Sequence, residues 1–150
     1  MIQRIQSVYL LVVTILLIVC MCTPVGAYIA EDYSVSKFTN LCIVSADGVK
    51  GYAPWAMFVI LVVAALLSFT TIFMFKKRML QIRMTIFSTI LLVGYYATLI
   101  TFIFMLKDDS MTFSASWTLC LPFVAIILNW LAIRAIGKDE VLVKAYDRLR

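Results

Sequence analysis

The sequence predicts an all-α membrane protein: a bundle of four antiparallel transmembrane helices followed by a short amphipathic helix. Two observations support this prediction. Four apolar runs fill most of the 150 residues, and each has about the 20 residues that cross a bilayer as a helix. The connections between the runs carry very unequal positive charge. The predicted spans cover residues 8–27, 54–75, 84–105 and 114–133.

The composition favours a single membrane domain over residues 1–150. The chain is 64% hydrophobic, whereas soluble domains average close to half. The net charge of +5 lies near the span ends and forms no basic stripe on a soluble fold, so no nucleic-acid partner is expected. The chain has no histidine, and it lacks a glycine-rich phosphate loop. We therefore predict no catalytic residue, no metal and no cofactor.

The charge pattern predicts the orientation. The two chain ends and the second connection carry Arg4, Lys76, Lys77, Arg78, Arg83, Arg134, Lys138, Lys144, Arg148 and Arg150. The opposite side carries only Lys37, Lys50 and Lys107. Short loops rich in lysine and arginine stay in the cytoplasm. We expect a multi-pass protein of a bacterial inner membrane, with both termini cytoplasmic.

The first span has one alternative interpretation. Val25-Gly26-Ala27 has the small residues of a signal-peptide cleavage site, but the apolar stretch before it is longer than a typical signal core. An uncleaved span is therefore favoured, and Pro24 should end or kink it. Ser7, Thr14 and Met21 recur every seven residues and predict its packing face, with Leu11 and Ile18 between them.

The outer loop, residues 28–53, is polar and contains several aromatic residues. Cys42-Ile43-Val44 and Val49 flank Asp47-Gly48, a pattern that predicts a short hairpin. The loop could be a partner-binding cap. We favour the alternative that its aromatic side chains lie on lipid headgroups.

Small or polar residues at helical spacing predict the interior faces of the other spans, because they let helices approach closely in lipid. The three stripes are Ala64, Ser68 and Thr71; Gly94, Thr98 and Thr101; and Thr118, Pro122, Ala125, Asn129 and Ala132. Asn129 is the most polar side chain at depth. We expect it to make an interhelical hydrogen bond.

The sequence of residues 138–150, which we call the tail, predicts a separate amphipathic helix. We expect it to lie along the inner leaflet or to pack under the bundle. Its carboxylates could pair with the basic residues of the second connection and dock it there. Glu140 and Lys144 form an i,i+4 pair. The candidate contacts to a partner or to lipid are Lys76, Lys77, Arg78, Arg83, Asp139, Glu140, Asp147 and Arg148.

The cysteines suggest a redox alternative. Cys20, Cys22 and Cys120 should lie at similar depth near the outer surface, with Cys42 in the adjacent loop. Thiols passing electrons to a quinone would need such a cluster. However, thiols of such enzymes lie in Cys-x-x-Cys motifs with basic residues nearby, and the sequence has neither feature around these cysteines. We therefore favour the alternative that they are small apolar packing residues.

Three segments resemble a known family: Met1–Leu10, Phe75–Arg83 and Lys138–Arg150. Together they are similar to the four-helix membrane proteins of Bacteroidota catalogued as domain of unknown function 4293. The resemblance covers the whole chain and implies an inner-membrane protein. It implies no activity, cofactor or catalytic residue.

The sequence therefore favours a non-enzymatic accessory or scaffold subunit of an inner-membrane assembly. Its expected partners are the lipid bilayer and a membrane protein or further copies of the chain. One alternative is an outer-face thiol oxidoreductase. Another is a small carrier or channel for a neutral or lipophilic substrate, which would need a polar cavity around Asn129, Tyr95 and Tyr96.

Overall fold

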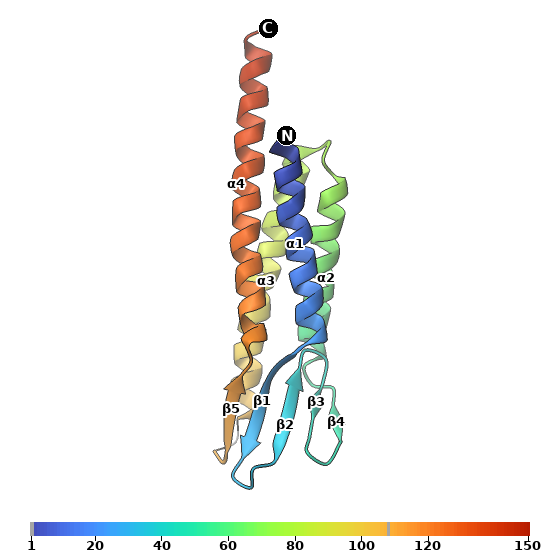
Figure 1. Ribbon diagram of the computed structural model, residues 1–150, viewed down its shortest axis with the longest axis vertical. Helices are drawn as coiled ribbons and strands as arrows, with labels where there is room; N and C mark the ends of the chain where they lie inside the picture. The colour runs from blue at the N-terminus through green and yellow to red at the C-terminus, as the bar shows by residue number, and fades with distance from the viewer. Residues whose placement is uncertain (1, 108) are drawn as a thin grey trace.

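A computed structural model of the chain describes residues 2–107 and 109–150. Its main feature is a bundle of four long helices that alternate in direction (Figure 1). They are α1 (Ile2–Cys22), α2 (Trp55–Phe73), α3 (Arg78–Leu106) and α4 (Cys120–Arg148). Each is long and apolar enough to cross a membrane. The prediction of four such helices is confirmed.

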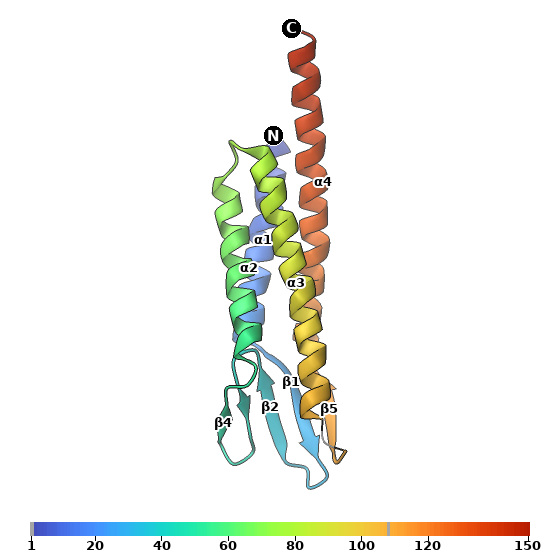
Figure 2. The same cartoon turned by 180° about the vertical axis from the view of Figure 1, so that it is seen from behind.

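A five-stranded antiparallel sheet caps one end of the bundle, so the all-α prediction is wrong (Figure 1). The strand order is β4-β3-β2-β1-β5. The strands are β1 (Pro24–Ala30), β2 (Val35–Thr39), β3 (Ile43–Val44), β4 (Lys50–Gly51) and β5 (Met111–Ala115). A short 3₁₀ helix, η1 (Trp117–Leu119), joins β5 to α4. We call this the sheet end; the chain ends and the α2–α3 connection lie at the opposite, terminal end (Figure 2).

The sheet corrects the boundaries of the first and fourth spans. Helix α1 stops at Cys22 because Pro24 has no N–H to continue it, and the Thr23 hydroxyl donates to the Val19 carbonyl (2.8 Å). The apolar residues that follow belong to β1, which lies between β2 and β5. At the start of the fourth predicted span, Ser114 and Ala115 pair with Ala27 and Gly26 of β1.

The predicted hairpin in the outer loop is confirmed. Strands β3 and β4 pair through Ile43 with Gly51 and Val44 with Lys50. The Ser45 N–H donates to the Val49 carbonyl (3.0 Å), and Gly48 has a φ of +80°. Glycine adopts this conformation without the steric cost that a side chain would add.

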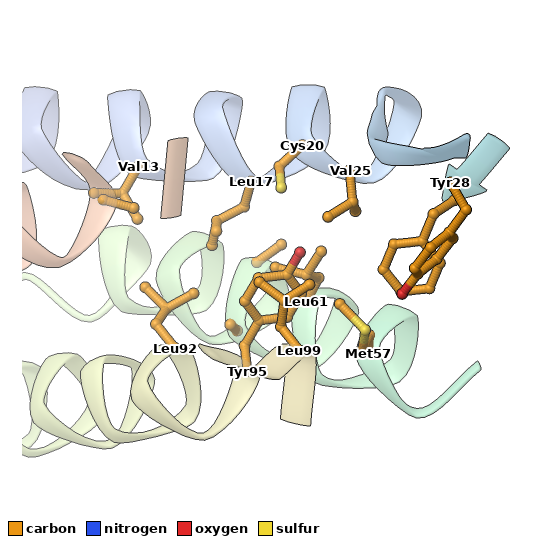
Figure 3. Packing of buried hydrophobic residues seen from close by; sticks show 14 residues of the cluster. Val13, Leu17, Cys20, Val25, Tyr28, Met57, Leu61, Leu92, Tyr95 and Leu99 are labelled. Atoms are coloured by element: carbon orange, nitrogen blue, oxygen red, sulfur yellow. The ribbon is translucent and has the colours of Figure 1, made fainter. Parts of the chain in front are cut away.

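The bundle and the sheet share one hydrophobic core (Figure 3). Leu17, Leu61 and Leu92 lie between the helices, while Val25 and Phe38 extend the same cluster into the sheet. Toward the terminal end the interior becomes polar. The buried polar side chains in that half include Gln6, Ser68, Thr71, Gln81, Thr85, Ser88 and Asp139.

Two of the four predicted packing faces are confirmed, and two are confirmed only in part: in α1, for example, Thr14 is buried and Met21 packs against the core. Ala64, Ser68 and Thr71 of α2 are buried, and so is the whole predicted stripe of the fourth span, whose first residue, Thr118, lies in η1. In α1, Leu11 and Ile18 are exposed. In α3, Thr101 is exposed, whereas Tyr95 is fully buried. The buried face of α3 consists instead of Gln81, Thr85, Ser88, Leu92, Tyr95 and Leu99.

The prediction of a separate tail helix is also wrong, because α4 continues without a break to Arg148. Gly137 costs a helix only about 1 kcal/mol relative to alanine, which is too little to end it. The last turns project beyond the bundle in the direction of the helix axis (Figures 1 and 2). They therefore do not fold back under the other helices.

Burial of the Tyr28 hydroxyl predicts a loss of stability in alkali. Its ring packs against Phe38 and Phe113, with centroids 5.9 and 5.1 Å away, and its hydroxyl has no partner among the described residues. Burial raises the pKa of Tyr28 above its usual value. The pKa of Tyr28 is thus higher in the folded state than in the unfolded state. The stability that comes from keeping this hydroxyl protonated is therefore complete below about pH 10, and it is lost as pH rises through the folded-state pKa.

We therefore expect Tyr28→Phe to keep its stability at high pH better than the original chain. Equilibrium unfolding in detergent between pH 7 and 11 measures the difference. Tyr33→Phe is the matched control, because Tyr33 is 88% exposed. Equal alkaline losses in the original chain and in Tyr28→Phe would contradict the assignment.

Candidate functional site

A groove at the terminal end brings several of the predicted contact residues together. It lies between the α2–α3 connection and α4 and has a volume of about 750 Å³. Its lining consists of Phe75, Lys76, Lys77, Arg78, Met79, Leu80, Glu140, Val143 and Lys144. Arg83 lies on α3 outside this lining, and Asp147 and Arg148 lie on the protruding end of α4.

Asp139 joins three helices at this end, although not through the predicted ion pairs. Its carboxylate accepts a hydrogen bond from Gln6 Nε2 of α1 (3.0 Å). Its backbone carbonyl accepts one from Arg78 Nη1 of α3 (3.3 Å). Within residues 2–107 and 109–150, no ion pair joins the tail carboxylates to the α2–α3 connection, so the predicted docking through such pairs is wrong. The predicted pair within α4 is confirmed, with Lys144 Nζ 2.9 Å from Glu140 Oε1.

The three segments that carry the family resemblance meet at this contact. Gln6 belongs to the first segment, Arg78 to the second and Asp139 to the third. Asp139 is buried, so its carboxylate needs a partner, and Gln6 supplies one. Asp139 is also the last buried residue of α4, and the helix is exposed from Val141 onward.

At the sheet end, Asn40 makes a second polar junction that sequence reasoning missed. It follows β2 and is fully buried. Its Nδ2 donates to the Cys20 carbonyl at the end of α1 (2.7 Å), and its Oδ1 accepts from the Tyr95 hydroxyl of α3 (2.6 Å). Figure 3 shows Tyr95 reaching across the interior toward Cys20. Nearby, the Tyr96 hydroxyl donates to the Leu119 carbonyl.

The four cysteines are free and differ in exposure. Cys20 is buried, Cys42 is partly buried, and Cys22 and Cys120 are exposed. Among the described residues, no group of three or more histidine, cysteine, aspartate or glutamate side chains could hold a metal ion. An oxidoreductase using these thiols should contain a disulfide that the quinone pool keeps oxidised. Thiol labelling of the protein in its own membrane measures this.

Asn129 does not make the predicted interhelical hydrogen bond. Its side chain is fully buried in the bundle, and neither amide atom has a hydrogen-bond partner among the residues described. It lies nine residues into α4, or about 13 Å at 1.5 Å per residue. An unpaired amide at this position destabilises the fold unless something else satisfies it.

We expect Asn129→Ala to leave the free energy of unfolding unchanged or to raise it by about 1 kcal/mol, since it removes an unsatisfied buried group. The control is Ser68→Ala, which removes the Ser68–Ser88 hydroxyl contact of 3.3 Å in the same bundle. That change should cost about 1 kcal/mol. Denaturation in detergent measures both variants. A clear loss of stability in Asn129→Ala would mean that its amide is satisfied in the folded protein.

These features define a class: α-helical proteins with four helices of membrane-crossing length, capped by a small antiparallel sheet. Residues 2–149 match the family model described as Domain of unknown function (DUF4293), and the chain belongs to this family. No curated protein matches the chain.

Proposed function

We propose that the protein is a non-enzymatic accessory or scaffold subunit of a bacterial inner-membrane assembly. In this proposal the terminal end is cytoplasmic and the sheet lies on the outer face. The distribution of lysine and arginine supports this orientation, because ten of the thirteen lie in the chain ends, the α2–α3 connection and the neighbouring turns of α3 and α4.

The observation that carries the proposal is the projecting end of α4. Its apolar side chains are largely exposed: Val141 by 68%, Tyr146 by 77% and Leu149 by 88%. The last turns of this part of α4 extend past the bundle, beyond the groove that α4 forms with the α2–α3 connection (Figure 1). Exposed apolar surface of this kind marks interaction sites. An amphipathic helix typically inserts its apolar face into a partner's groove.

The occupant that we propose is a helical groove on another membrane protein. Four of the last seven residues of the chain are charged, namely Lys144, Asp147, Arg148 and Arg150. They alternate with the apolar positions, which suits a helix bound in a groove with a polar rim.

Photocrosslinking in native membranes tests the proposal. A photoreactive residue is placed at Leu142 or Tyr146 of the tagged full-length chain, and the control carries it at Ile127, an exposed position within the bundle-forming part of α4. The expected result is one adduct of defined mass from the two tail positions and none from the control. An adduct of two copies of the chain, or no adduct, would overturn the proposal.

A second candidate function, a carrier or channel for a neutral substrate, is favoured by one observation: the unpaired amide of Asn129. A bound polar molecule would satisfy it. Tyr95 and Tyr96 contribute less, because their hydroxyls already donate to Asn40 and to the Leu119 carbonyl.

The test for this candidate is the water accessibility of position 129. In a chain without its native cysteines, Asn129→Cys should react with a small water-soluble thiol reagent if the interior holds a polar pathway. Ala132→Cys, buried on the same stripe, serves as the comparison. Failure of Asn129→Cys to react would count against a carrier.

A further inference from the structure

We propose that the groove between the α2–α3 connection and α4 binds the phosphate of an anionic phospholipid headgroup. The groove is lined by four cationic side chains, Lys76, Lys77, Arg78 and Lys144, and by one carboxylate, Glu140. Its side chains therefore carry a formal charge of +3. Basic pockets beside membrane helices on the cytoplasmic side suit anionic headgroups.

Most of this positive charge is not neutralised within the protein. The Glu140 carboxylate is already paired with Lys144 at 2.9 Å. Arg78 donates to a neutral backbone carbonyl, that of Asp139, which orients the guanidinium without cancelling its charge. Lys76 and Lys77 are exposed, and no carboxylate of the described residues lies within ion-pair distance of them.

The start of α3 adds to the attraction for an anion. Its first turn contains no acidic residue, and no side chain caps it. The first helical hydrogen bond at this end runs from the Gln81 N–H to the Lys77 carbonyl (3.0 Å). The N–H groups before Gln81 lack helical partners and give this end partial positive charge. Met79 and Leu80, which carry two of these N–H groups, also line the groove.

The walls of the groove distinguish a lipid from a soluble phosphate. Phe75, Met79 and Val143 are each exposed by 44% or more. Phe75 and Met79 lie where α2 ends and α3 begins, at the boundary of two helices of membrane-crossing composition, and Val143 lines the groove from α4. A phosphodiester with acyl chains can occupy both the basic and the apolar surface. Inorganic phosphate can contact only the basic surface.

Two double variants with the same change in net charge distinguish binding in the groove from general electrostatic attraction to the protein. Lys76→Gln/Lys77→Gln removes two of its cations. Arg83→Gln/Arg148→Gln removes two exposed cations from the same end of the molecule but outside the groove lining. Both variants lower the net charge by two, and neither changes Arg78 or Asp139, so both should fold.

The measurement is lipid binding to the purified full-length chain in non-ionic detergent, by native mass spectrometry with phosphatidylglycerol or phosphatidylcholine added. We expect preferential retention of phosphatidylglycerol, with affinity lowered on the order of tenfold in Lys76→Gln/Lys77→Gln and less than about twofold in the control variant. Inorganic phosphate should not compete at millimolar concentration. Equal losses in both variants, equal binding of phosphatidylcholine, or displacement by inorganic phosphate would each overturn the proposal.

Discussion

Replacing Asn40 by alanine should lower the free energy of unfolding by about 2–4 kcal/mol, because one buried group loses its partner, at about 1–3 kcal/mol, and a second loses its shorter bond. The first is the Tyr95 hydroxyl, which donates to Asn40 Oδ1 at 2.6 Å. The second is the Cys20 carbonyl, which accepts from Asn40 Nδ2 at 2.7 Å and would keep only the 3.4 Å bond from the Thr23 hydroxyl. Asn40 connects the strand region to α1 and α3, so its loss should loosen the sheet from the bundle. Denaturant titration in detergent, followed by circular dichroism, measures the change.

Two comparisons make this prediction specific. Tyr95→Phe keeps the bond from Asn40 to the Cys20 carbonyl and should cost less, about 1–2 kcal/mol. Asn129→Ala alters the other asparagine of the chain, whose amide is unpaired, and should cost nothing. If Asn40→Ala were as stable as Asn129→Ala, the junction would not contribute to stability.

Gly26→Ala should destabilise the protein by about 1–3 kcal/mol or more, the range for overpacking a filled site. A Cβ at Gly26 would lie 2.6 Å from the Ser114 carbonyl oxygen and 2.7 Å from the Phe113 ring. The oxygen belongs to the backbone of β5, so the neighbouring strand itself must move. We expect a lower midpoint of thermal unfolding and weaker protection of the β1–β5 amides from hydrogen exchange.

The matched control is Gly51→Ala in β4. A Cβ there would meet nothing within 4 Å, so its stability should stay within about 0.5 kcal/mol of the original. If Gly26→Ala unfolded at the same temperature as this control, the close approach of β5 to β1 would be wrong.

Hydropathy predicted the four helices correctly but could not predict the sheet. The apolar residues of β1 directly follow those of α1. A hydropathy average cannot tell the two elements apart, because Val25 and Ile29 of the strand are as apolar as Leu17 of the helix. Pro24 predicts where the helix ends, but a proline does not by itself predict that a strand begins there. The pairing of Ile29 with Thr112 joins distant parts of the chain, which no local pattern reveals.

The candidate site was predicted in part. The charge pattern predicted ion pairs between the tail carboxylates and the basic residues of the α2–α3 region, and these do not form among the described residues. Lys76, Lys77 and Glu140 do line one groove, which the charge pattern did not predict. The actual contact uses the Asp139 carbonyl, and a charge pattern says nothing about backbone groups. Asn40 was missed because it lies in a polar connection without periodicity, where its burial leaves no trace in the sequence.

The position of β1 between β2 and β5 has a consequence for biosynthesis. Ile29 and Thr112 are 83 positions apart in the sequence, yet they are partners on the neighbouring strands β1 and β5. A chain made from its N-terminus completes β1 and β2 early, whereas β5 emerges only after α2 and α3. Until then β1 presents an unpaired edge, the kind of surface that recruits foreign strands. During synthesis the sheet therefore has an unpaired edge at β1, and this edge becomes paired only when β5 has been made.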